Sequence, residues 1–164
     1  MAQDNHIITA LVRNHSGVLT RISGLFARRC YNIDSLSVCA TDDPNLSRMT
    51  IVAAGDDAAI DQIIKQLQKL PDAVKVARLC GAGDITRELL LIKVRLSPPK
   101  RPEIESTVNM FKAKTVDLST SSIVIEMTGE PNKIDAFVAL MRPYGIIELV
   151  RTGLTAIERG GSTT

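Results

Sequence analysis

The sequence predicts an α+β protein built from two tandem ferredoxin-like βαββαβ domains. The first reason is an internal repeat. Gly55 to Leu67, GDDAAIDQIIKQL, and Gly129 to Met141, GEPNKIDAFVALM, share a glycine, an acidic residue, an Ile-Asp pair and an apolar helical stripe. The second reason is that each copy follows a run rich in β-branched residues and precedes a short strand pattern. Because such a repeat sets the architecture of a chain, we expect two copies of one domain.

The first copy has the order strand, helix, strand, strand, helix, strand. Its strands are indicated by runs of apolar and β-branched residues, and the polar turn TDDPNLS separates the second strand from the third. The expected strands are His6 to Val12, Ile33 to Ala40, Arg48 to Ala54 and Val74 to Leu79. This order is that of one complete ferredoxin-like domain.

Each helix of the first copy has an apolar stripe at helical spacing. Ser16 can cap the first helix, since its hydroxyl can accept a backbone N–H of the first turn, and Asp56 or Asp57 can cap the second. The stripes are Val18, Leu19, Ile22, Leu25 and Phe26 in the first helix, and Ile60, Ile63, Ile64, Leu67 and Leu70 in the second. We therefore expect both helices to pack on one face of the sheet.

The second copy follows the segment CGAGDITRE, which we interpret as a linker. Its first strand is Leu89 to Leu96, and a helix begins at about Pro102, because proline is favoured at a first helical position. The apolar face of that helix is Ile104, Val108 and Phe111. The expected domains are residues 4–81 and 82–164. Each is small for an independent core, so we expect the sheets to pair in a homodimer or between the domains.

Composition and charge exclude several classes of protein. Hydrophobic residues make up 45% of the chain and aromatics only 3%, which is typical of a globular protein with an aliphatic core. The net charge is +2, and the third strand RMTIVAA has no aromatic residue for base stacking, so nucleic-acid binding is not expected. The start MAQDNHIITALV lacks a signal-peptide pattern, and no apolar run approaches the ~20 residues of a membrane span.

Cysteine and histidine are scarce in this chain. Cys30, Cys39 and Cys80 form no CxxC pair, and His6 and His15 are the only histidines. This set is poor material for a metal site or a disulfide framework. A reduced, cytoplasmic compartment is the simplest interpretation.

The turn Asn14-His15-Ser16-Gly17 is the first candidate site. A helix N-terminus favours an anion, and Gly17 has no Cβ to keep a ligand from the backbone. A carboxylate could rest on the amides of Gly17 to Leu19, braced by Asn14. The alternative is that Ser16 and Gly17 only cap the helix. Phosphate binding is disfavoured because the turn has no Lys, and catalysis by His15 because no nucleophile or carboxylate lies beside it in the sequence.

Asn32, at the other end of the same helix, is the second candidate. It can fix a polar end of a ligand, or it can simply stop the helix, since Asn tolerates the left-handed conformation. GAGDIT (Gly81 to Thr86) lacks the third glycine and the long helix of a dinucleotide-binding loop, so we interpret it as part of the linker. The acidic pair Asp42-Asp43 is interpreted as turn chemistry beside Pro44 rather than as a cation site.

Several separated motifs resemble the regulatory, or small, subunit of acetolactate synthase, also called acetohydroxyacid synthase. They are NHSGVLTRISGLFARRCYNIDSLSV, TDDPNLSRMTIV, GAGDITRELLLIKV and the tail VRTGLTAIERG, in that order. The resemblance covers nearly the whole chain. It implies that the first domain is an ACT domain, a ferredoxin-like module that senses amino acids, and that the second is an ACT-like domain.

The resemblance also implies a function. A chain of this family is a non-catalytic subunit that binds the large catalytic subunit, activates it, and confers feedback inhibition by valine in branched-chain amino acid biosynthesis. Leucine or isoleucine would compete weakly. Thiamine diphosphate, magnesium and FAD belong to the large subunit, and this chain binds none of them. Consistent with this, it lacks the Gly-Asp-Gly and Asn-Asn signature of thiamine diphosphate sites.

The effector residues that the resemblance implies lie at both ends of the first helix. They are Asn14, His15, Ser16, Gly17, Val18 and Leu19 at its start, and Asn32 and Ile33 after its end. In the family these two ends come from facing protomers of a homodimer. The amides of the first turn would bind the amino acid's carboxylate, the asparagines its other polar groups, and Val18, Leu19 and Ile33 its branched side chain. The alternative is a free-standing amino-acid sensor that acts on another enzyme or regulator.

One position departs from the family pattern. The family usually has Gly before the aromatic-Asn pair, where this chain has Cys30. That place suits a residue with positive φ, which is cheap for Gly and strained for Cys. Either the turn differs here or strain is stored beside Asn32.

Overall fold

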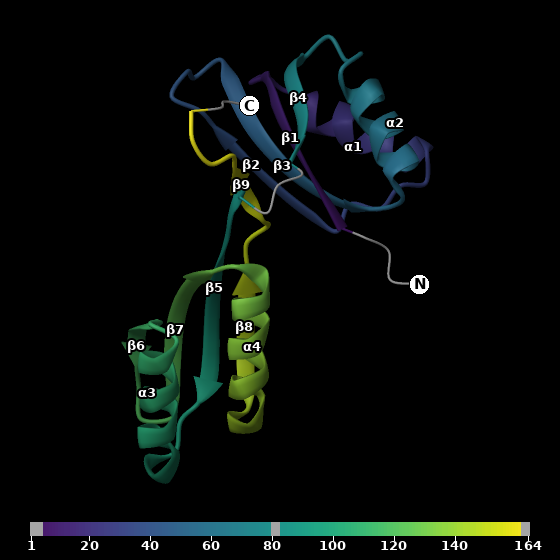
Figure 1. The fold of residues 1–164 in the computed structure, drawn as a ribbon. Coiled ribbons are helices and arrows are strands. Elements are labelled where there is room, and N and C mark those ends of the chain that lie inside the picture. The colour runs from purple at the N-terminus through teal and green to yellow at the C-terminus, as the bar shows by residue number, and fades with distance from the viewer. Residues whose placement is uncertain (1–4, 80–82, 162–164) are drawn as a thin grey trace. The chain divides into compact units, whose positions relative to one another are not determined.

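The computed structural model describes residues 5–79 and 83–161, which form two compact units (Figure 1). Unit 1 is Met1–Ile85 together with Gly153–Thr164, and unit 2 is Thr86–Thr152. Cys80 and the start of the expected linker lie outside the described residues. No helix in the described ranges is long and apolar enough to cross a membrane.

Unit 1 contains the first βαββαβ motif, and the predicted order is confirmed. Its elements are β1 (Asn5–Arg13), α1 (Val18–Arg28), β2 (Ser35–Ala40), β3 (Leu46–Ala54), α2 (Asp57–Leu67) and β4 (Ala73–Leu79). The strands form an antiparallel sheet in the order β2-β3-β1-β4, so β2 and β4 are its edges.

The core of unit 1 lies between the sheet and its two helices. Alternate residues of β1 point to the helices because side chains of a strand alternate between faces. Ile8, Ala10 and Val12 are buried there with Ile22, Phe26, Ile60 and Ile63. The predicted stripes are therefore correct with one exception. Leu19 is 47% exposed, so it lies at the edge of the helical layer rather than in the core.

Unit 2 repeats the same architecture. Its elements are β5 (Ile85–Arg95), α3 (Arg101–Met110), β6 (Lys114–Leu118), β7 (Ser122–Gly129), α4 (Pro131–Met141) and β8 (Ile146–Arg151), with short 3₁₀ turns at Pro98–Lys100 and Arg142–Tyr144. The strand order β6-β7-β5-β8 corresponds to that of unit 1. Ile104, Val108, Ile125, Ile134 and Phe137 are among its buried core residues.

The C-terminal segment differs from the expected domain boundary. The expected second domain comprised all of residues 82–164, whereas Gly153–Thr164 groups with unit 1. This segment contains β9 (Thr155–Ile157), and its side chains Leu154 and Ala156 are only 5% and 2% exposed. The tail has no counterpart in the first copy, so the internal repeat carried no signal for its placement.

The first helix of each unit ends in the same way. In unit 1 the N–H of Tyr31 donates to Phe26 O and that of Cys30 to Ala27 O, and Cys30 has a φ of 56°. Lys112 repeats this geometry with a φ of 57°. These contacts define a Schellman motif, in which glycine is the usual residue. Of the two alternatives for Cys30, the structure therefore supports stored strain rather than a different turn.

Candidate functional site

The turn after β1 is fixed by backbone contacts to two other loops. The N–H of Arg13 donates to Asp72 O at 2.8 Å, and that of Asn14 donates to Asn45 O at 2.7 Å. The side-chain amide of Asn14 donates to Pro44 O at 2.9 Å. The donor half of the Asn14 amide therefore braces the β2–β3 turn, while its carbonyl oxygen has no hydrogen-bond partner among the described residues.

The start of α1 differs from the predicted capping. Gly17, not Ser16, is the N-cap residue, and no side chain makes a capping hydrogen bond there. Gly17 has a φ of 87°, a left-handed conformation that only glycine adopts without cost. Its carbonyl accepts the first helical bond from Arg21 N at 3.0 Å. The predicted Ser16 cap is thus wrong, because the left-handed residue turns the chain before the helix begins.

Two features leave the first turn of α1 suited to an anion. The turn contains no acidic residue, so no carboxylate of its own neutralises the positive end of the helix dipole. A Cβ built on Gly17 would meet no atom within 4 Å, so the space beside the backbone is open. The geometry is that of an accessible, uncapped helix N-terminus.

His15 has a partner that sequence analysis missed. Its Nε2 lies 3.0 Å from Asp72 Oδ1, and its Nδ1 lies 3.0 Å from Ser16 O. Asp72 also accepts a hydrogen bond from the Arg21 guanidinium, and its side chain is only 10% exposed. No carboxylate lies beside His15 in the sequence, but the fold brings Asp72 next to it. Asp72 follows Pro71 in a turn pattern, but nothing in the spacing links that turn to His15.

A small hollow opens beside this turn. Its volume is about 80 Å³, and Asn14, His15, Val18, Leu19 and Val38 are among its lining residues. Leu19 and Val38 are 47% and 43% exposed, so the hollow has an apolar rim at the β2 edge of the sheet. Pockets that enclose small molecules usually measure about 300–1,000 Å³, so this hollow can hold only part of a ligand.

The second candidate lies at the other end of α1. Asn32 is exposed, and its side-chain amide donates to Asp34 Oδ1 at 2.5 Å. Ile33 is half-buried and packs against the core of unit 1. A hollow of about 370 Å³ opens here, lined by Cys30, Tyr31, Asn32, Asp34, Gly55 and Asp56, among others.

One chain does not bring the two candidates together. They are separated by α1, which has 11 residues and is therefore ~16 Å long. They also line different hollows. A single free amino acid cannot reach from the amides of the first turn to Asn32 of the same chain.

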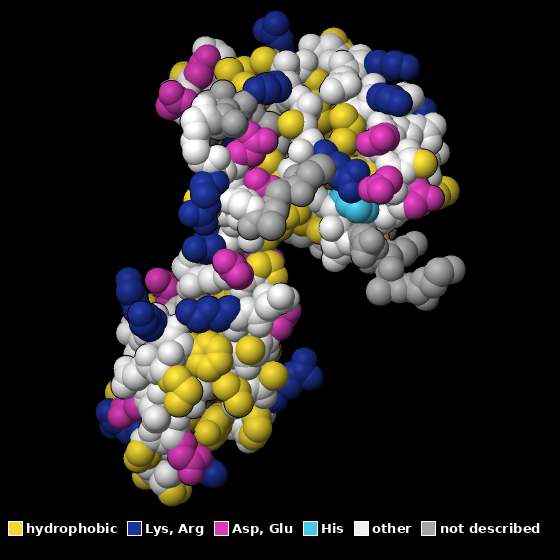
Figure 2. All heavy atoms as spheres, viewed as in Figure 1, with side chains coloured by type: hydrophobic (Ala, Val, Ile, Leu, Met, Phe, Trp, Pro, Cys, Tyr) yellow, Lys and Arg dark blue, Asp and Glu magenta, His cyan; other side chains and the backbone are white. Residues whose placement is uncertain are grey.

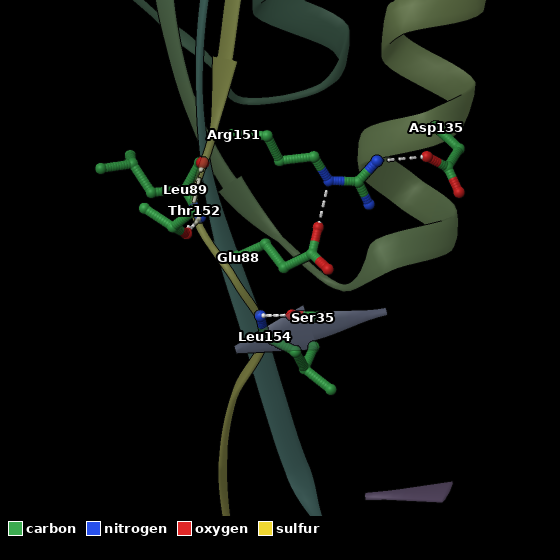
Figure 3. A network of polar contacts seen from close by, with 7 residues as sticks. All are labelled: Ser35, Glu88, Leu89, Asp135, Arg151, Thr152 and Leu154. Carbon is green, nitrogen blue, oxygen red and sulfur yellow. Dashed lines mark hydrogen bonds and ion pairs between the residues drawn. The ribbon is translucent and has the colours of Figure 1, made fainter. Parts of the chain in front are cut away.

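Unit 2 contains a polar network of a different kind (Figure 3). The Arg151 guanidinium bonds to Glu88, which is 9% exposed, and to Asp135 at 2.6 Å. Partial burial alone would lower the pKa of Arg151, but its hydrogen bonds to Asp135 and Glu88 prevail and hold the pKa above its ordinary value. The network joins β5, α4 and β8, which is a structural role. Across the described residues no group of three His, Cys, Asp or Glu side chains could hold a metal ion.

Hydrophobic side chains also gather on the surface of unit 2. In the view of Figure 2 they lie over its helical layer. Met110 and Leu140, which belong to α3 and α4, are 74% and 49% exposed. A patch of this kind is a candidate surface for a protein partner.

Two protein-family models match the chain. Residues 8–75 match the ACT domain of AHAS small-subunit-like proteins, and residues 87–160 match the small subunit of acetolactate synthase. The first match covers the helix α1 and both candidate positions. The second covers unit 2 and most of the described C-terminal tail.

Known proteins are similar to this chain over almost its whole length. A probable acetolactate synthase small subunit from Archaeoglobus fulgidus is 50% identical over 155 residues, which is 94% of this chain and 97% of that protein. The acetolactate synthase small subunit of Bacillus subtilis is 46% identical, covering 94% of this chain and 90% of that one. The isozyme 3 small subunit of Escherichia coli is 40% identical, covering 94% and 95%.

A solved structure has the same fold throughout. The crystal structure of the acetolactate synthase small subunit from Thermotoga maritima superposes with a TM-score of 0.90 at 38% identity, covering 97% of this chain and 99% of that one. The two family models, the curated relatives and this structure agree. The chain therefore belongs to the family of acetolactate synthase small subunits, with an N-terminal ACT domain.

Proposed function

We propose that this chain is the regulatory subunit of an acetolactate synthase in branched-chain amino acid biosynthesis. It binds the catalytic large subunit, raises its activity and confers feedback inhibition by valine. The observation that carries the proposal is full-length similarity to acetolactate synthase small subunits, at 50% identity over 94% of the chain in one case. The proposed location is the cytoplasm.

The proposed effector site lies at the seam of a homodimer. A two-fold axis pairs the same surface of both protomers, so the start of α1 in one chain can face the end of α1 in the other. The small hollow beside Asn14 would then be completed by the partner's Asn32 and the partner's Ile33. The exposed side chains of Leu19 and Val38 support this, because they lie where such a seam would cover them.

Each part of valine has a matching group at this seam. Its carboxylate would accept hydrogen bonds from the uncapped amides of Val18 and Leu19, where the helix dipole favours negative charge. Its branched side chain would pack on the apolar rim, and burying it contributes roughly 1.5–3 kcal/mol. One methylene changes affinity by only about 1–3 kcal/mol. Leucine and isoleucine should therefore compete weakly.

The proposal assigns the chemistry to the large subunit. Thiamine diphosphate, magnesium and FAD would be bound there, and this chain would contribute no ligand to them. Its role is to change the catalytic subunit's activity through contact, for which the exposed apolar residues over α3 and α4 are one candidate surface.

Reconstitution tests the proposal. The purified chain alone should form no acetolactate from pyruvate, the large subunit should be stimulated when the chain is added, and valine should reverse that stimulation. Turnover by the chain alone, or an unchanged rate of the large subunit, would refute it. Stimulation without any valine response would leave a regulatory subunit that senses something else.

A further inference from the structure

The C-terminal tail lies on the sheet of unit 1 next to β2. The N–H of Leu154 donates to Ser35 Oγ at 2.8 Å (Figure 3). The hydroxyls of Ser37 and Thr155 lie 3.4 Å apart, and the Arg48 guanidinium donates to Ala156 O at 3.3 Å. These contacts, with the burial of Leu154 and Ala156, make the tail an integral part of the ACT domain.

The tail uses the sheet face that the helices leave uncovered. Ser35 and Ser37 pair with Val52 and Thr50 on β3, so these four residues share one face. Leu36, between the two serines, packs against the core on the helical side. Thr50 and Val52 are only 3% and 8% exposed, although they lie on the face that the helices do not cover.

Gly153 is required by close approach rather than by a turn. A Cβ at this position would lie 2.5 Å from the carbonyl oxygen of Leu36 and 2.7 Å from its carbon, so even alanine would force the tail and β2 apart. Both obstructing atoms are backbone atoms, which cannot rotate away. The tail can therefore lie this close to the start of β2 only because Gly153 has no side chain.

The contacted end of β2 is the end that carries the effector candidate. Ser35 and Leu36 follow Asn32 and Ile33 directly, with only Asp34 between them. Asp34 is bonded to β3 through its N–H, which donates to Val52 O at 2.9 Å. Because β2 is an edge strand, only β3 pairs with it inside the sheet, and the tail supplies its second support.

We propose that Ser35 and Gly153 are positioning residues of the effector site. The tail fixes the start of β2, and β2 fixes the Asn32–Ile33 segment in the place where it receives the amino acid. This inference rests on the proposed function, because the position of Asn32 matters only if Asn32 binds the effector.

The tail also joins this segment to unit 2 by the covalent chain. Thr152 precedes Gly153, and its N–H and hydroxyl bond to the carbonyl and N–H of Leu89, each at 2.9 Å. Thr152 is therefore anchored within unit 2, as Leu154 is anchored within unit 1.

Alanine substitutions in the full chain test the inference. Gly153→Ala and Ser35→Ala are assayed on the reconstituted enzyme for activation of the large subunit and for inhibition by valine. They should raise the valine concentration for half-inhibition by about 2- to 30-fold, the range by which residues outside a site modulate coupling. Gly161→Ala is the matched control, since a Cβ there meets nothing within 4 Å. It should change neither quantity.

Hydrogen exchange of the chain without valine separates this inference from the proposed function. The amides of β2 (Ser35–Ala40) should exchange faster in Gly153→Ala and Ser35→Ala than in the wild type or in Gly161→Ala, while those of β1 keep their protection. Unchanged β2 exchange in both variants would overturn the inference, even if wild-type inhibition by valine is found. If the wild type ignores valine but β2 exchange rises as expected, the proposed effector fails and the positioning of β2 by the tail stands. Should Gly153→Ala not fold, Ser35→Ala decides by the same criteria.

Discussion

At the scale of single residues, Gly17 combines an unusual backbone with a proposed chemical role. Its φ of 87° costs an ordinary side chain roughly 1–2 kcal/mol, although Asn and Asp tolerate it better than others. The space around it is open, so a short side chain meets strain but no clash. A short charged side chain can therefore replace Gly17 with little change in the structure of the turn.

Gly17→Asp, compared with Gly17→Asn, should separate charge from strain. Both variants carry the same backbone cost, but only the aspartate repels the carboxylate of valine, by about 1 to 4 kcal/mol at ~4 Å. We expect the Asp variant to need about fivefold more valine than the Asn variant, or more still. Valine inhibition and activation are measured together on the reconstituted enzyme. Equal inhibition in the two variants would place the carboxylate elsewhere.

Cys30 stores strain that its replacement should release. A non-glycine residue in the left-handed region costs about 1–3 kcal/mol, against which glycine loses roughly 0.5–1 kcal/mol through unfolded-state entropy. Cys30→Gly should therefore stabilise unit 1 by about 1 kcal/mol in urea unfolding. Cys30→Ala keeps a Cβ at a φ of 56° and should give no comparable gain. A more stable Ala variant would point to the thiol rather than the backbone.

Residue-level prediction worked where a local rule decides, and failed where distant segments meet. The resemblance to the family, which usually has Gly at position 30, indicated a residue with positive φ there, and the Schellman ending of α1 accounts for it. The pairing of His15 with Asp72 joins residues that only the closed sheet brings together. The Ser16 cap was wrong because serine and glycine are both common before a helix, and their order alone does not say which one ends the turn.

At the scale of elements, the two repeats cap their second helices differently. Asp56 accepts a hydrogen bond from Ala59 N at 2.7 Å, whereas Glu130, in the corresponding place before α4, makes no capping bond. Asp56→Ala should therefore destabilise unit 1 by about 1 kcal/mol. Glu130→Ala loses only an exposed contact to Arg87 at 3.6 Å, which is worth little. Chemical unfolding of both variants checks this, and an equal cost would contradict the capping account.

The elements themselves could be predicted almost completely, and the tail could not. Apolar alternation and helical stripes locate the strands and helices of the first copy and most of those of the second, because burial against one sheet dictates the pattern. The strand β6 (Lys114–Leu118) has no buried residue and therefore no such pattern. The tail residues Leu154 and Ala156 also alternate, but three strand residues have no turn or partner signal in the sequence. They are held by contacts to Ser35 and Arg48, which lie far from the tail along the chain.

At the scale of the whole molecule, the separation of the two candidate positions is the central fact. The length of α1 keeps the first-turn amides and Asn32 apart in one chain, and each position lines its own hollow. A site made of both therefore requires two chains. The sequence resemblance implied this division, and the geometry of one protomer is consistent with it.

A mixed dimer tests this claim most directly. One chain carries Gly17→Asp and the other Asn32→Ala, and the heterodimer is isolated with two different affinity tags. If each site combines residue 17 of one chain with residue 32 of the other, one site of the heterodimer contains both substitutions and the other contains neither. Calorimetry should then find one valine bound per heterodimer with wild-type affinity. Wild-type dimers should bind two valines with that affinity, and neither altered homodimer should have a site of wild-type affinity. If the site lay within a single chain, every site of the heterodimer would carry a defect. A heterodimer without a site of wild-type affinity, beside a wild type that binds valine, would contradict the account.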